Sequence, residues 1–283
     1  MKKPDPTVYS EDIAKYENIK RIEEKYNCAI EFIEVPWEQL ESKLEESVLE
    51  GSPFADIVYL PMNFSVSAIA KGYLLPVSEF VSPNSDVLTD NIVVTLMGKL
   101  IDDEYGIKTV EVPDNGVFMG YNKSIIDELD LETPILSWML EEIKGLSFEY
   151  GIVPFPTGPD NISGKTCAIS YDAFYIPKGV KEPEKVYQVL EELLWFFGDN
   201  IDLRDAGKEE WLRGLWVTEE SYEMSIEVSK YHGKLEMYEF VPDFPMGEIM
   251  GAVILEGMTV KEAVELYDKQ AQDAIDRLLE KNN

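Results

Sequence analysis

Residues 51–64 have the sequence GSPFADIVYLPMNF. The mostly apolar run at 55–60 predicts a buried strand, and residues 64–71 after it predict a short helix. In α/β sheets, ligands bind just beyond the carboxyl ends of strands. The connection from Tyr59 to Phe64 therefore occupies the kind of position at which such sheets hold a ligand.

The segments before this stretch predict the same class of fold. Apolar residues at helical spacing predict a helix over 11–26, with Ser10 as its cap. The largely apolar segment 29–35, rich in β-branched residues, predicts a strand covered on both faces. Residues 37–48 predict a second helix that ends at Gly51. Helix, strand, helix, strand and helix at this spacing predict an α/β fold with parallel strands.

The rest of the chain predicts fewer regular elements. Strands are expected at 107–112, 116–121, 150–155 and 167–176, with a turn joining the first two. Helices are expected at 184–197 and, after the capping box of Thr259 and Glu262, along the last helix to Leu278. Residues 78–90 predict a loop, and 199–245 are only weakly periodic.

Composition excludes several classes of function. The 283 residues hold 25 Lys and Arg against 55 Asp and Glu, a formal net charge of −30. We therefore expect no nucleic-acid partner, because phosphate contacts need a basic surface. No membrane insertion is expected, since no apolar run approaches the ~18 residues of a spanning helix. Cys28 and Cys167 are expected to be buried free thiols, and a single histidine, His232, argues against a zinc site or a catalytic triad. No cofactor or metal is expected.

Several blocks of sequence occur in an order that is itself informative. They are IKRIEEKY (19–26) with EFIEVPW (31–37), GSPFADIVYLP (51–61) with AKGYLLP (70–76), YNK (121–123), YGIVPFPTGP (150–159) with YIPKGV (175–180), and GMTVKEA (257–263). Together they resemble family 1 of the bacterial extracellular solute-binding proteins, the carbohydrate-binding proteins of ABC importers. The resemblance implies a type II periplasmic-binding-protein-like fold, in which two lobes close around a sugar without catalysis.

Two departures from that family shape the expected domain organisation. Its members begin with a strand that residues 1–10 lack, and they carry most of a second lobe where this chain passes directly from Pro134 to Ser137. We therefore expect a type II parallel-sheet lobe with a reduced second lobe and a free pairing edge on the sheet. The expected parts are an N-terminal α/β lobe (1–112), crossing segments with the second-lobe remnant (113–176), and a helical part packing mainly on the first lobe (177–283).

A sugar site needs flat aromatic faces for the C–H side of the ring and fixed polar groups for the hydroxyls. Asn63 and Phe64 are candidates because they follow a predicted strand. By resemblance to the family, Trp138, Tyr171 and Asp172 match positions near the cleft, and Asn115 lies in a crossing turn. The structural alternatives are a helix cap and a core ring for the first two, packing for Trp138, a solvated carboxylate for Asp172 and turn geometry for Asn115. Trp37 is expected in the core.

Three functions remain open at this stage. The resemblance favours an extracellular or cell-surface protein that binds a sugar or oligosaccharide and delivers it to the permease subunits of an ABC importer. A glycosidase is disfavoured because 55 acidic residues create chance carboxylate pairs and none stands out. The missing segment instead favours a one-lobe interaction module, truncated or degenerate, that transports no sugar. The acidic surface suits a neutral ligand and would repel an anionic one.

Overall fold

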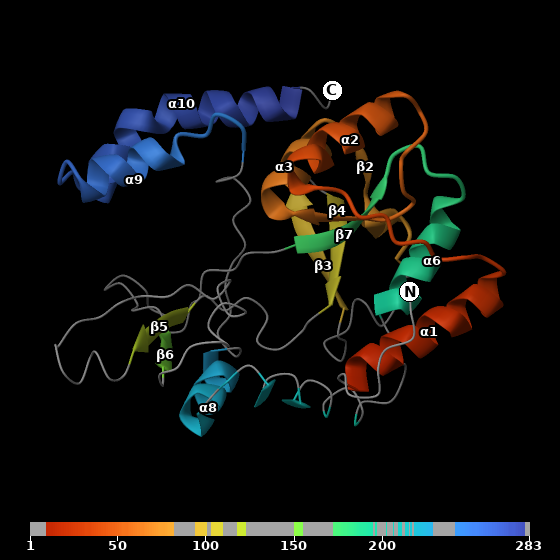
Figure 1. The fold of residues 1–283 in the computed structure, drawn as a ribbon. Coiled ribbons are helices and arrows are strands. Elements are labelled where there is room, and N and C mark those ends of the chain that lie inside the picture. Colours follow the sequence, from red (N-terminus) through yellow and green to blue (C-terminus); the bar gives the residue numbers. More distant parts are fainter. Residues whose placement is uncertain are drawn as a thin grey trace.

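A sheet with helices on both faces is the main unit of the fold (Figure 1). The computed structural model describes residues 10–81, 94–100, 103–109, 118–122, 150–154, 172–194, 196 and 241–280, together with 202, 206, 209–210, 213–214, 216 and 218–228. Cys167 and His232 lie outside these ranges, whereas Cys28 is a free thiol that is exposed, which corrects its expected burial. Within the described part, no helix is both long and apolar enough to cross a membrane.

The first three helices confirm the periodicity of the sequence. They are α1 (Ser10–Tyr26), α2 (Trp37–Leu49) and α3 (Met62–Ala70). Helix α2 ends where glycine permits a left-handed backbone, because Gly51 has a φ of +73°. The Gly51 and Ser52 amides donate to the carbonyls of Val48 and Ser47, both at 3.0 Å, and so satisfy the last turn.

The main sheet is antiparallel in every pairing of the described strands, which corrects the predicted parallel arrangement. Its order is β1 (Val58–Pro61), β7 (Asp172–Pro177), β4 (Asp103–Thr109) and β3 (Val94–Leu100), and β2 (Leu74–Leu75) also pairs with β7. Strands β1 and β4 run in the same direction, but β7 lies between them and runs the opposite way. A strand from far along the chain thus replaces a parallel ladder, and β1 ends the described order.

Two predicted strand features are wrong. Residues 29–35 are not a buried strand: they are irregular, and Phe32 and Ile33 are largely exposed. No described strand pairs with this segment, so its β-branched residues have no ladder to join. Among the described strands, the predicted pairing of 107–112 with 116–121 is also not found, because β4 pairs with β3 and β7 instead. Strand β5 (Phe118–Asn122) pairs with β6 (Tyr150–Pro154) in a separate small sheet.

Each face of the main sheet has its own apolar core. The core under α2 and α3 contains Leu44, Val58, Leu60, Val66, Ile69 and Tyr175, with Leu278 from the last helix. The opposite core contains Val77, Ile107, Ile176, Tyr187, Leu190 and Leu194. Its helix α6 (Pro183–Leu194) falls within the predicted 184–197 range, and α1 packs on its outer side. A short 3-10 turn, η1 (Val77–Glu79), closes this core.

The C-terminal helices include two that the sequence did not predict. These are α8 (Glu219–Val228), which packs on β6, and α9 (Met246–Ile254), which packs on the predicted last helix α10 (Val260–Glu280). The capping box of α10 is confirmed, since the Thr259 backbone amide donates to the Glu262 carboxylate at 2.9 Å. The C-terminal half of α10 reaches the first core, while α9 and the start of α10 project away from it as an arm (Figure 1).

Candidate functional site

The candidate site lies at the carboxyl end of β1. Helix α3 begins directly after Pro61, the last residue of β1, so Asn63 and Phe64 lie in the first turn of α3. The first turn of a helix presents backbone N–H groups without intrahelical partners and a partial positive charge. Asn63 is exposed and Phe64 is half-buried, so an amide and one aromatic ring are offered at this strand end.

An aromatic pair joins the starts of two helices at this end. The ring centroids of Trp37, the first residue of α2, and Phe64 are 4.8 Å apart, with their planes tilted by 43°. Trp37 is 57% exposed, which corrects its expected place in the core. Because the indole lies against Phe64 and still faces solvent, it offers a supported apolar surface of the kind on which sugar rings stack.

Asp172 lies at the same edge because of strand register. It opposes Pro61 in the pairing of β1 with β7, and its side chain is half-buried. The Tyr175 phenol on the same strand is held neutral: burial and the charge of Asp172 raise its pKa to about 12, against the opposing effect of a hydrogen bond with Ser65. The β7 strand therefore brings a carboxylate to the strand end that also holds Asn63 and Phe64.

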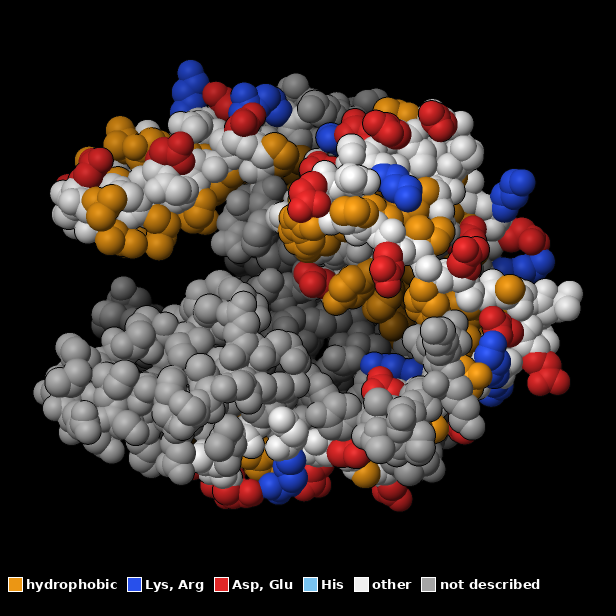
Figure 2. Space-filling view, viewed as in Figure 1, with side chains coloured by type: hydrophobic (Ala, Val, Ile, Leu, Met, Phe, Trp, Pro, Cys, Tyr) orange, Lys and Arg blue, Asp and Glu red, His pale blue; other side chains and the backbone are white. Residues whose placement is uncertain are grey.

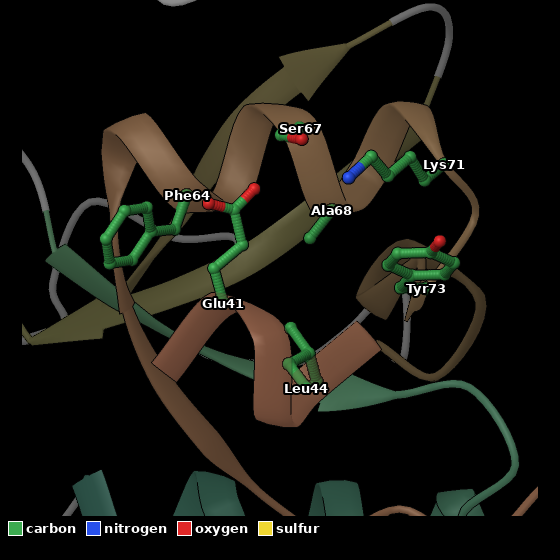
Figure 3. Close-up of a pocket in the computed structure, with 7 residues that line it drawn as sticks. All are labelled: Glu41, Leu44, Phe64, Ser67, Ala68, Lys71 and Tyr73. Carbon is green, nitrogen blue, oxygen red and sulfur yellow. The ribbon is translucent and has the colours of Figure 1, made fainter. Parts of the chain in front are cut away.

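A shallow groove between α2 and α3 extends from this edge (Figure 3). It is lined by Glu41, Leu44, Phe64, Ser67, Ala68, Lys71 and Tyr73. Figure 3 places Phe64 at one end of the groove and Lys71 and Tyr73 at the other. The edge and the groove thus share one aromatic ring.

The far end of the groove is organised by Glu45. Its carboxylate accepts hydrogen bonds from the Tyr73 hydroxyl at 2.8 Å and from Lys71 Nζ at 3.2 Å. These bonds hold the pKa of Glu45 below its ordinary value, and the bond from Tyr73 has the larger effect. Burial and the Glu45 carboxylate in turn raise the pKa of Tyr73 to about 12. A carboxylate kept ionised accepts hydrogen bonds but is a poor general acid, so the arrangement suits binding.

The remaining predicted residues are not brought into this arrangement. Asn115, Trp138 and Tyr171 lie outside the described residues. Asn63, Phe64 and Asp172 all lie near the carboxyl end of β1, and Trp37 contacts Phe64 although sequence reasoning placed it in the core. No local signal in the sequence marks the exposure of Trp37, because it depends on what α3 leaves uncovered. In the described part of the chain, no cluster of His, Cys, Asp and Glu side chains is placed to hold a metal ion.

The chain resembles solved structures more clearly than it resembles any sequence. No family model and no curated protein matches it. UgpB from Mycobacterium tuberculosis, solved with glycerophosphocholine, superposes with a TM-score of 0.55 at 14% identity, over 93% of this chain and 95% of that one. The maltose/maltodextrin-binding domain MalE from Bdellovibrio bacteriovorus, bound to maltotriose, gives 0.53 at 11% identity, over 96% and 97%.

A third similar structure is the ABC-transporter-associated binding protein from B. animalis subsp. lactis Bl-04, solved in complex with β-1,6-galactobiose. Its TM-score is 0.54 at 10% identity, over 94% of this chain and 96% of that one. These likenesses show the fold: the chain has the type II periplasmic-binding-protein-like α/β fold that the sequence blocks predicted. The division into parts at residues 112 and 176 stays a prediction.

Proposed function

We propose that the protein binds a neutral sugar or oligosaccharide at the edge formed by the starts of α2 and α3 and the start of β7. The observation that carries the proposal is the Trp37–Phe64 pair, with a 4.8 Å centroid separation and an indole that remains 57% exposed. In this account the indole stacks on the sugar ring, while Asn63 and Asp172 bind its hydroxyl groups. No bond of the ligand is broken.

Charge and fold support this choice of ligand and role. A chain with a net charge of −30 repels anions, so a neutral ligand is favoured. Three similar folds were solved with glycerophosphocholine, maltotriose or β-1,6-galactobiose, and none of those ligands carries a net negative charge. We extend the proposal to an extracellular or cell-surface protein that delivers its ligand to the permease subunits of an ABC importer. Asn115, Trp138 and Tyr171 stay candidates for further contacts.

The test is ligand-induced stabilisation of the purified protein. A panel of mono- and oligosaccharides that includes maltotriose and β-1,6-galactobiose is screened by thermal unfolding. A ligand that binds only the native state raises Tm in proportion to ln(1 + [L]/Kd), so one sugar class is expected to give a concentration-dependent rise. Calorimetric titration then measures the affinity of that sugar, and chromatography is expected to recover it unchanged.

A matched pair of variants assigns the binding to the aromatic edge. Trp37→Ala is expected to weaken the affinity at least about tenfold, because it removes the stacking surface. Leu49→Ala is the control, since Leu49 lies at the other end of α2 and is 69% exposed. It is expected to bind as the unaltered protein does. A cooperative melt that no sugar shifts would contradict the proposal and favour the interaction module. A cleaved sugar would instead favour a glycosidase.

A further inference from the structure

The arm made by α9 and the first turns of α10 carries an apolar surface that the core does not use. Met250 and Ile254 are 50% and 67% exposed, and Leu255 at the end of α9 is 84% exposed. On α10, Val260 and Val264 are 65% and 46% exposed. Figure 2 shows hydrophobic side chains gathered on this arm, at the upper left of the view. We call these five residues the arm patch.

The spacing of the arm patch groups its residues into one stripe on each helix. Met250 and Ile254 are four residues apart on α9, as are Val260 and Val264 on α10, so each pair lies on one side of its helix. A stripe on each of two packed helices gives the shape to which a third helix packs.

The contacts that hold the arm together do not use the patch. Two small residues are buried along it, Ala252 (2% exposed) on α9 and Ala263 (0%) on α10. The linker is held by the Met258 amide, which donates to the Ala252 carbonyl at 3.1 Å, and by Gly257 with a φ of +74°. Thr259 and Glu262 then cap α10. A preformed surface loses little conformational entropy when a partner binds.

Charge on the arm indicates which partner fits. Between residues 246 and 268 the sequence has five carboxylates, Glu248, Glu256, Glu262, Glu265 and Asp268, against one lysine, Lys261. That lysine lies 3.7 Å from Glu265, so its charge is already offset. A second copy of the arm would bring the same acidic groups together, and an anionic membrane would also be repelled.

We propose that the arm patch is a docking surface for a basic amphipathic helix of a partner protein. The apolar side of such a helix covers Met250, Ile254 and Val264, while its lysine or arginine side chains face the carboxylates around them. This inference stands apart from sugar binding, because it uses no residue of the aromatic edge.

A peptide of defined sequence tests the proposal on the full chain. The probe is a fluorescently labelled Leu/Lys peptide of about 15 residues, patterned to form one apolar helical side. A second peptide with the same composition in scrambled order has the same charge but no such side. The patterned peptide is expected to bind at least about tenfold more tightly in fluorescence anisotropy, and its affinity is expected to fall as salt is added.

Variants assign the binding to the arm. The double change Ile254→Gln and Val264→Gln is expected to weaken the patterned peptide at least about tenfold, because it removes the apolar contact from both helices. Leu49→Gln, an equally exposed change on α2, is the control and is expected to leave the affinity unaltered. Glu248→Gln with Glu256→Gln is expected to reduce binding severalfold at low salt only.

Three outcomes would overturn the proposal. Equal binding of both peptides would mean that the acidic surface attracts any cation. A dimer in light scattering that Ile254→Gln with Val264→Gln makes monomeric would identify a second copy as the occupant. No peptide binding, together with a lower Tm in that double variant, would mean that the patch is covered within the chain itself.

Discussion

The sheet under α3 and the arm of α9 and α10 use the same residue types in opposite ways. Leu60 in β1 is 0% exposed and lies in the core with Val66 and Ile69. Leu255 in the arm is 84% exposed, and the buried side chains along α9 and the first turns of α10 are the alanines Ala252 and Ala263. The sheet is therefore held by burial of large side chains, whereas the arm is held by small residues and helix caps. The apolar residues of the arm patch, which the arm does not bury, are therefore free to contact a partner.

The largest difference between the two regions is expected when one leucine in each is replaced by alanine. Leu60→Ala is expected to lower the free energy of unfolding by about 2–5 kcal/mol, because it removes buried methyl groups and leaves a cavity. Leu255→Ala is expected to change it by less than about 0.5 kcal/mol. Urea unfolding measures both. A comparable loss in Leu255→Ala would show that the arm patch is buried in solution.

A glycine-to-alanine change is expected to have opposite signs in the two regions. A Cβ on Gly106 would lie 2.7 Å from Tyr175 Cε1, and that ring is buried, so Gly106→Ala is expected to lose about 1–3 kcal/mol. Nothing lies within 4 Å of a Cβ on Gly251 in α9. Gly251→Ala is therefore expected to gain up to about 1 kcal/mol of helix stability. Thermal and urea unfolding measure the pair.

The cause of the Gly106 effect can be checked separately. Combining Gly106→Ala with Tyr175→Leu is expected to cost less than the sum of the two single changes, since the smaller side chain leaves room for the methyl group. Strict additivity would mean that backbone conformation, and not the tyrosine ring, determines the cost.

The contrast between local and distant contacts also explains what the sequence could predict. Helices α1, α2 and α10 were predicted because apolar spacing and the Thr259 capping box are local signals. The segment 29–35 has the composition of a buried strand, but composition cannot tell whether a partner strand lies beside it. The prediction of parallel strands was wrong for the same reason, because strand direction in the sheet depends on β7 lying between β1 and β4.

The residues of the candidate site also differ in whether a local signal could predict them. Asn63 and Phe64 were predicted as site candidates because they directly follow a strand, which is a local feature. Asp172 was placed by resemblance to the family, and its position opposite Pro61 is a matter of register. The exposure of Trp37 depends on what α3 leaves uncovered, and no residue near Trp37 in the sequence encodes it.

A smaller effect is expected from the cap that holds the arm. In Thr259→Ala the Glu262 amide loses its bond to the Thr259 hydroxyl, at 3.3 Å, and that hydroxyl no longer donates to the Glu262 carboxylate, at 2.7 Å. The expected loss is about 1 kcal/mol, measured by urea unfolding. Thr259→Ser keeps the hydroxyl and is expected to retain most of the stability. An equal loss in both variants would mean that the methyl group, not the cap, matters.

The smallest effect is expected from the charged contacts that join α6 to α1 at a partly exposed surface. Glu192 of α6 accepts hydrogen bonds from Arg21 at 2.8 Å, from Tyr26 at 2.6 Å and from Lys25, and so joins α6 to α1. Burial raises the pKa of Glu192, but the bonds from Lys25, Tyr26 and Arg21 outweigh it, and the net pKa lies below the ordinary value. Glu192→Gln is expected to lose about 1 kcal/mol or less near neutral pH.

The pH dependence tests whether charge is the cause. Because the folded pKa of Glu192 is lowered, its contribution is fully present above the unfolded pKa of about 4.3 and is lost as the pH falls toward the folded value. The difference in urea midpoint between the unaltered protein and Glu192→Gln should therefore shrink below about pH 4.3. Glu182→Gln is the control, since its pair with Lys185 is exposed on both sides. A difference that persists unchanged at low pH would mean that the shape of the Glu192 side chain, and not its charge, holds α6 against α1.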